Sequence, residues 1–232
     1  MPVDGIYQLI MGCAIAAGWW ISRRTQAQIA IKSWQRYGLL FGAFCGAMIG
    51  AKLPFVFVDW DAFLSGAAWF QNGKTILFGL VGGYIGVELA KWAFDIHVRT
   101  GDSFAVPVAV TIAIGRLGCF WAGCCYGKPT DVAWAAVFPS VDSLPRHPAQ
   151  IYESAFHLTA AGILVAAQRD GIAKGHLIKI YIVAYAVFRF FSEFYRDEPI
   201  VALNMTLYQG LAIFIATLFG IIWYRDARRG AS

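Results

Sequence analysis

Residues 103–121 read SFAVPVAVTIAIGRLGCFW, and Arg116 is the single charged residue in this stretch. A helix that crosses the hydrocarbon core of a bilayer needs about 20 mostly apolar residues, so the stretch is typical of a membrane-spanning helix. The whole chain shares this character, because 59% of its 232 residues are hydrophobic and only 14% are charged. Soluble domains are about 45–50% apolar and about 25% charged. The sequence therefore predicts a protein embedded in a membrane.

The same composition excludes several other classes of protein. A soluble fold would expose more apolar surface than water tolerates, and a disordered chain would be far more polar. Five cysteines in 232 residues do not make a disulfide-stapled scaffold. The formal charge of +5 is better explained by the loops of a membrane protein than by binding to nucleic acid.

Apolar stretches that end in polar clusters recur along the chain. They predict an all-α, polytopic membrane protein, with residues 1–232 forming one integral-membrane domain. The seven predicted transmembrane helices are Gly5–Ile21, Gly38–Val58, Thr75–Trp92, Ser103–Trp121, Ala149–Gln168, Leu177–Phe194 and Leu203–Trp223.

Lys and Arg residues are distributed unevenly over the two sets of connecting segments. Twelve of the 19 lie in the loops after the first, third and fifth predicted spans or at the C-terminus. The opposite set holds only Lys74, Lys128, Arg146 and Arg196. Because cytoplasmic loops carry the excess of basic residues, we expect the C-terminus in the cytoplasm and the N-terminus outside.

Three stretches bring charged groups to the extracytoplasmic ends of the predicted spans: 115–127, 146–153 and 189–199. A charge at the centre of a bilayer costs at least about 2.5–3.5 kcal/mol. Charged groups within or next to the spans are therefore expected to have a structural or functional role. Guanidinium groups offer forked donors that match phosphate oxygens. The pattern predicts an outward-facing site for a phospholipid headgroup, either catalytic or only binding. The alternative is that Arg116 and Arg189 pair with Glu153 and Glu193 merely to lock the helices together.

These stretches resemble the prolipoprotein diacylglyceryl transferase family. Residues 115–127 follow the frame of its signature, roughly Gly-Arg-x-Gly-Asn-Phe-x-Asn-x-Glu-x-x-Gly. Residues 146–153 and 189–199 resemble its Arg-His-Pro-Ser-Gln-x-Tyr-Glu and Arg-x-x-x-Glu-Phe-x-Arg segments, and Asp102 and Gln209 also fall in register. The resemblance covers roughly residues 45–225 and includes seven spans with an external N-terminus.

The resemblance implies transfer of the diacylglyceryl group of phosphatidylglycerol to the cysteine thiol of a lipoprotein precursor, with release of glycerol phosphate. It implies a multi-pass protein of the bacterial cytoplasmic membrane whose site faces the extracytoplasmic side, with no cofactor, no metal and no nucleic acid. Arg116 and Arg189 would hold the phosphate, Glu153 would be a further catalytic residue, and His147 is the candidate base. The predicted substrate-binding residues are Gly82, Gly83, Gly115, Gly118, Cys119, Cys124, Arg146, Gln150, Tyr152, Glu193 and Arg196.

Four positions depart from the family pattern. Val81 replaces a histidine of the family, Cys119 and Ala122 replace asparagines, and Cys124 replaces a glutamate. Two further readings are therefore open: a different acceptor (a lipid, a glycan or a small molecule), or a non-catalytic phospholipid-binding or redox protein. His147 has a competing role in fixing the loop before the fifth span. The thiols of Cys119, Cys124 and Cys125 could be free, disulfide-bonded, nucleophilic or metal-binding.

Two features of the third span have simpler interpretations. Gly79, Gly82, Gly83 and Gly86 form a stripe that favours close helix packing, with room for a bound lipid as the alternative. Glu88 and Lys91 are spaced for a local ion pair.

Overall fold

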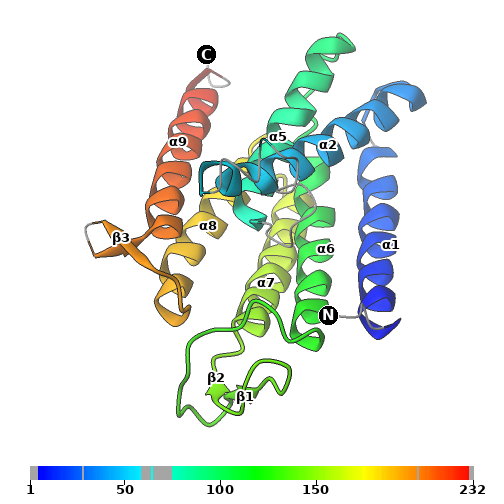
Figure 1. Ribbon diagram of the computed structural model, residues 1–232. Helices are drawn as coiled ribbons and strands as arrows, with labels where there is room; N and C mark the ends of the chain where they lie inside the picture. The colour runs from blue at the N-terminus through cyan, green and yellow to red at the C-terminus, as the bar shows by residue number, and fades with distance from the viewer. Residues whose placement is uncertain (1–4, 28, 59–63, 65–74, 203, 230–232) are drawn as a thin grey trace. The chain divides into compact units, whose positions relative to one another are not determined.

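The computed structural model describes residues 5–27, 29–58, 64, 75–202 and 204–229 (Figure 1). The chain is mostly helical, with very little strand. The long helices are α1 (Gly5–Ala27), α2 (Ser33–Val58), α5 (Ile76–Ala93), α6 (Asp102–Trp121), α7 (Ala149–Arg169), α8 (Leu177–Ser192) and α9 (Leu207–Arg229). They form two compact units, one of residues 1–27 with 100–232 and one of residues 28–99. The prediction of one domain stays a prediction.

Every predicted span coincides with a helix, but the boundaries differ at several ends. Helix α1 continues to Ala27, α2 begins at Ser33, and α8 ends at Ser192, where the one-turn helix η1 (Glu193–Tyr195) follows. The predicted start of the last span, Leu203, lies outside the described residues, and α9 begins at Leu207.

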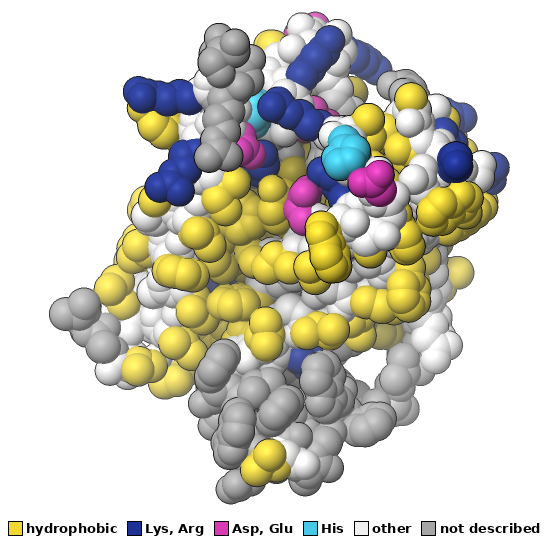
Figure 2. Space-filling model, turned by 90° about the horizontal axis from the view of Figure 1, so that it is seen from above, with side chains coloured by type: hydrophobic (Ala, Val, Ile, Leu, Met, Phe, Trp, Pro, Cys, Tyr) yellow, Lys and Arg dark blue, Asp and Glu magenta, His cyan; other side chains and the backbone are white. Residues whose placement is uncertain are grey.

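Five helices in the described part of the chain are long and apolar enough to cross a membrane: α1, α2, α5, α6 and α9. Helix α8 has only 16 residues, or about 24 Å at 1.5 Å per residue, against a hydrocarbon core of about 30 Å. Helix α7 carries Gln150, Glu153 and His157 among its apolar residues. Apolar side chains such as Ile15 and Phe214 are exposed on the helix surfaces, and Figure 2 shows hydrophobic side chains over much of the face in view.

In the unit of residues 28–99, glycines set the contact between α2 and α5. A Cβ added to Gly86 would overlap the carbonyl oxygen of Gly42, and one added to Gly82 would overlap that of Gly46. The backbones of the two helices therefore approach closely because side chains are absent there. The packing interpretation of the glycine stripe is confirmed, as is the Lys91–Glu88 ion pair at 3.1 Å.

In the other unit, α1, α6, α7, α8 and α9 pack in sequence with alternating directions (Figure 1). Gly18 of α1 lies against Thr111 of α6, and the Ser154 hydroxyl of α7 donates to the Ala113 carbonyl of α6 at 2.9 Å. At the start of α6, the Asp102 carboxylate accepts hydrogen bonds from the backbone N–H groups of Gly175 (2.5 Å) and Leu177 (2.9 Å). Because helix N-termini carry unpaired N–H groups, Asp102 fixes the beginning of α8.

Two short hairpins lie at the other end of this unit. Strands β1 (Ala136–Val137) and β2 (Pro145–Arg146) pair within the segment between α6 and α7. Strands β3 (Ile200–Ala202) and β4 (Met205–Thr206) pair immediately before α9. No strands are predicted here from the sequence, because the runs are too short to show a period-2 pattern.

Candidate active site

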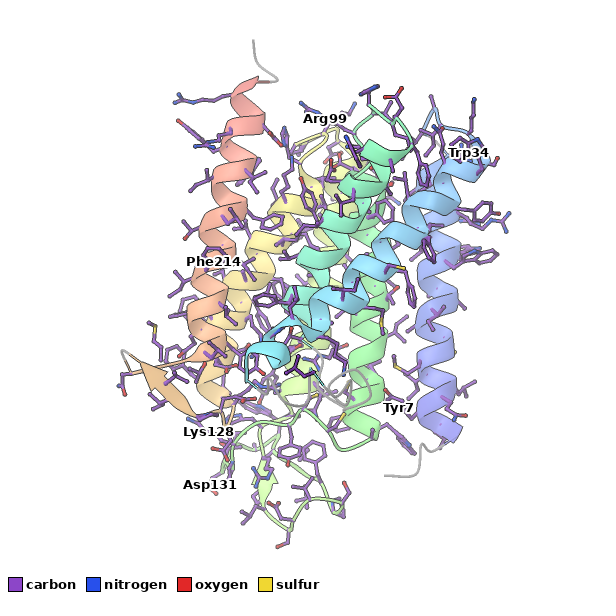
Figure 3. All side chains as sticks on the ribbon, turned by 45° about the horizontal axis from the view of Figure 1, so that its top comes forward. Tyr7, Trp34, Arg99, Lys128, Asp131 and Phe214 are labelled. Carbon is purple, nitrogen blue, oxygen red and sulfur yellow. The ribbon has the colours of Figure 1, made fainter. Side chains whose placement is uncertain are left out.

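The charged residues of the three polar stretches come together where α6 ends, α7 begins and α8 ends. Arg116 lies near the end of α6, Glu153 in the first turns of α7, and Arg189 in the last turn of α8. Figure 3 shows Lys128 and Asp131 of the segment after α6 at the same end of this unit as Tyr7, near the start of α1. These residues share one end because neighbouring helices run in opposite directions.

Glu153 is the centre of the cluster. Its side chain is 1% exposed and forms a buried ion pair with Arg116, whose Nε donates to Oε2 at 2.5 Å. The Tyr185 hydroxyl of α8 donates to the same oxygen at 3.2 Å, and Arg196 Nη1 lies 3.8 Å from Oε1. Arg189 follows Tyr185 by one turn, on the same face of α8. One carboxylate thus holds guanidinium groups from separate segments close together.

Arg189 has its own acidic partner. Its Nη1 lies 2.5 Å from Glu193 Oε2 and donates to Ser192 Oγ at 3.5 Å. A guanidinium has five N–H donors, and the hydrogen bond and closest ion-pair contact of Arg189 within the described residues use only Nη1. The guanidinium also lies over the Tyr208 ring, 5.5 Å from its centroid.

Residues at the start of α9 form hydrogen bonds that position Glu193. The Thr206 hydroxyl donates to Glu193 Oε1 at 2.9 Å and accepts the backbone N–H of Gln209 at 3.2 Å. The Gln209 side chain accepts the N–H of Thr206 in return, at 3.0 Å. This reciprocal pair is a capping box, so the N-terminus of α9 positions Glu193 and, through it, Arg189.

Two side chains of the cluster hold the chain just after α6. Gln150 is fully buried, and its Nε2 donates to the Cys124 carbonyl at 2.6 Å. Arg196 Nη1 donates to the Cys125 carbonyl at 3.1 Å. These contacts connect the stretch 115–127 with the stretches 146–153 and 189–199.

Three thiols lie at this point of the chain, and the structure shows Cys119, Cys124 and Cys125 as free cysteines. Hydrogen bonds with Cys119 and Cys124 lower the pKa of the Cys125 thiol, and the nearby arginines act in the same direction. Hydrogen bonds with the other two thiols raise the pKa of Cys124. The cysteines therefore form one interacting group next to Arg116.

His147 lies in an aromatic environment beside the cluster. Its Nδ1 is 3.1 Å from the Tyr152 hydroxyl, and its ring packs against Tyr195 with centroids 5.0 Å apart. Trp134 Nε1 donates to the Tyr152 hydroxyl at 2.7 Å. Burial, and to a lesser extent the charge of Lys128, lower the pKa of His147, so its imidazole is neutral at pH 7 and able to accept a proton.

Arg146 pairs with another carboxylate, that of Asp142. It donates to both carboxylate oxygens of Asp142, at 3.3 and 2.5 Å, and lies over the Tyr126 ring. Arg146 lowers the pKa of Asp142. Among the described contacts, Arg146 supports the loop, and its predicted substrate-binding role stays a prediction.

Four glycines that are predicted to bind substrate lie against neighbouring helices. Gly118 faces Tyr7, Ile10 and Met11 of α1, and Gly115 faces Met11. Gly82 and Gly83 lie on α5 in the other compact unit, against α2. These contacts account for the glycines by packing, and binding to a substrate stays a prediction for all four.

Sequence reasoning missed Tyr185, Thr206, Asp142 and Glu198. Tyr185 lies one turn before Arg189 and therefore on the same face of α8, a spacing that could have identified it. Thr206 and Gln209 have the sequence spacing of a capping box, and this spacing could have identified Thr206. Glu198 lies 3.8 Å from Arg196, and burial raises its pKa.

The helices and this cluster define a multi-pass membrane protein with a buried arginine–glutamate site at one end of a helical unit. A family model described as prolipoprotein diacylglyceryl transferase matches residues 5–224. The chain therefore belongs to the prolipoprotein diacylglyceryl transferase family.

Several curated relatives carry the name phosphatidylglycerol–prolipoprotein diacylglyceryl transferase. The chain is 30% identical over 211 residues to the protein of Pseudoalteromonas atlantica, covering 88% of this chain and 74% of the relative. It is 33% identical over 163 residues to that of Clostridium tetani, covering 66% and 65%. A second such protein of Clostridium perfringens is 30% identical over 188 residues, covering 76% and 73%.

Proposed function

We propose that this chain transfers the diacylglyceryl group of phosphatidylglycerol to the cysteine thiol of a lipoprotein precursor. The relatives are named for these two substrates. The observation that carries the proposal is the convergence of Arg116 and Arg189 on the Glu153–Glu193 cluster at one end of the helices. Forked donors at that position suit the phosphate of a lipid headgroup.

The reaction exchanges one bond at a glycerol carbon for another. The acceptor sulfur forms a bond with the carbon, and the bond from that carbon to the phosphate oxygen breaks. The electron pair stays on the phosphate, which leaves as part of glycerol phosphate. Negative charge grows on the leaving group, so cations fixed in advance lower the barrier. Arg116 and Arg189 would supply that charge, with Glu153 and Glu193 holding them in place.

Purified protein in vesicles of phosphatidylglycerol tests this proposal with a peptide that carries the lipoprotein cysteine. The expected product is the peptide with a diacylglyceryl thioether, and the same peptide with serine in place of cysteine should stay unmodified. Consumption of phosphatidylglycerol without a peptide product would contradict the proposed acceptor and favour another one. Binding of lipid without any consumption would contradict an enzymatic role.

His147 is proposed to take the proton of the acceptor thiol. Because burial lowers its pKa, we expect kcat/KM to fall on the acid side with a midpoint below that of an exposed histidine. His147→Gln should remove this acid limb and lower the rate at neutral pH by about a hundredfold. The pH profile of both proteins measures this. An acid limb that persists unchanged in the variant would assign it to another group.

We also propose seven membrane crossings, with the N-terminus and the arginine cluster outside and the C-terminus in the cytoplasm. The basic residues at the opposite end of the unit support this orientation: Arg23, Arg24, Arg169, Lys174, Arg225 and Arg228. A green fluorescent protein fused to the C-terminus should fluoresce in cells, and an alkaline phosphatase fused there should be inactive. The reverse pattern would overturn the proposed orientation.

A further inference from the structure

Three cysteine sulfurs converge beside the arginine cluster. The Sγ atoms of Cys119, Cys124 and Cys125 all lie within 4.8 Å of one another. No other group of three or more such His, Cys, Asp or Glu ligands is found among the residues that the structure describes. The group is accessible, because Cys125 is exposed and the other two cysteines are half-buried.

The backbone turn that gathers these sulfurs is specific. Helix α6 ends at Trp121, two residues after Cys119, and Gly123 and Cys125 then adopt left-handed conformations with φ of 64° and 61°. Such a φ is uncommon for any residue except glycine. The carbonyls of Cys124 and Cys125 are in turn held by Gln150 and Arg196, so the arrangement is built by the same residues that form the cluster.

Three thiolates at this spacing match the needs of a zinc ion. A Zn–S bond of about 2.3 Å places the sulfurs of a tetrahedral site about 3.8 Å apart, a separation below the upper limit of 4.8 Å found here. Zinc sites that act on a substrate have three protein ligands and keep the fourth position open. Arg116 Nη1 lies 3.9 Å from Cys119 Sγ, so a zinc ion bound to Cys119 would lie near an arginine that is proposed to bind the phosphate.

We propose that Cys119, Cys124 and Cys125 bind a zinc ion and that the thiol of the acceptor substrate takes its fourth position. This inference rests on the proposed function and assigns a site to its second substrate. Thiolates are the ligands that zinc prefers among the available groups, and a thiol that coordinates zinc is deprotonated. The nucleophile would thus be held as a thiolate beside the arginines that take the leaving phosphate.

Each atom in this step has a defined destination. On binding zinc, the acceptor thiol loses its proton to His147, the base proposed above. Its sulfur then forms the bond to the glycerol carbon as the carbon–oxygen bond to the phosphate breaks, with no change of oxidation state. The product sulfur is a neutral thioether, which binds zinc weakly and leaves the fourth position free.

Zinc binding itself is measured on the full chain, reduced and in detergent, by adding Zn²⁺, removing the excess and determining the metal content. We expect one zinc per chain, and loss of it in Cys119→Ser, Cys124→Ser and Cys125→Ser. Cys13→Ser and Cys45→Ser are matched controls that should retain the metal. With Co²⁺ as a spectroscopic probe, the cysteine peptide should change the spectrum and its serine version should not. Absence of stoichiometric metal, or metal that persists in all three variants, would overturn the proposal.

The consequence for transfer is tested on the wild-type protein, which avoids any folding defect of the variants. A thiol with a pKa of about 8.5 is only about 3% ionised at pH 7, so full ionisation is worth about thirtyfold. Removing zinc with a chelator should therefore lower transfer about thirtyfold at pH 7, with the deficit shrinking as the pH rises above the pKa of the free thiol. Full transfer after complete removal of zinc would refute the zinc site and leave the transferase intact. Zinc and peptide binding without any transfer would refute the transferase and leave the metal site intact.

Discussion

Replacement of Arg116 by alanine is expected to lower diacylglyceryl transfer by about a hundredfold to a thousandfold, the loss typical of a donor that stabilises charge in a transition state. The guanidinium of Arg116 is buried, forms an ion pair with Glu153 and lies at the end of α6 where the other arginines gather. Its contribution is proposed to grow as charge builds on the leaving phosphate, so kcat should fall more than the apparent affinity for lipid. Initial rates at several concentrations of phosphatidylglycerol separate these two effects.

Two variants make the Arg116 result specific. Arg116→Lys keeps the positive charge but loses the fork that binds two phosphate oxygens, so it should recover only part of the activity. Arg169→Ala removes an exposed arginine at the opposite end of α7 and should retain wild-type rates. Transfer by Arg116→Ala at more than a tenth of the wild-type rate would mean that the guanidinium does not act on the reacting phosphate.

Replacement of Glu153 by alanine is expected to destabilise the protein by about 3–5 kcal/mol, because it leaves buried cations without their partner. Glu153 contacts Arg116, Tyr185 and Arg196, which come from three different segments. The substitution should therefore weaken the packing of α6, α7 and α8 against one another and also abolish transfer. Titration of the purified protein with a denaturing detergent, followed by circular dichroism, measures the change in unfolding free energy.

A double-mutant cycle distinguishes this account from a simple loss of packing. If the penalty arises from unpaired charge, Arg116→Ala combined with Glu153→Ala should cost less than the sum of the two single changes. Glu153→Gln keeps the volume and should retain more stability than Glu153→Ala. Strictly additive losses in the cycle would show that the ion pair is not the origin of the effect.

The helices could be predicted from the sequence because a bilayer imposes a length and a composition on every crossing. The polar groups inside these helices were also informative, since Arg116, Glu153 and Arg189 are costly in lipid and need partners. The two pairs weighed as a structural alternative, Arg116 with Glu153 and Arg189 with Glu193, are present in the structure. Pairing and phosphate binding are compatible, because a guanidinium has donors for both.

Other features depended on contacts between distant segments that no local pattern encodes. The carboxylate of Asp142 draws Arg146 into the loop before α7, whereas the sequence grouped Arg146 with the other arginines. The convergence of Cys119, Cys124 and Cys125 depends on a left-handed turn at Gly123 and Cys125, and a cysteine gives no sequence signal for that conformation. The contacts of Gly115 and Gly118 with α1 are a further example, because the neighbours of a helical glycine are set by helix packing.

The most direct test is an experimental density map of the full chain in nanodiscs that contain phosphatidylglycerol. We expect a lipid phosphate within hydrogen-bonding distance of both Arg116 and Arg189, at the extracytoplasmic face. Lipid headgroups only elsewhere, or guanidinium groups that face separate regions with no anion between them, would contradict it.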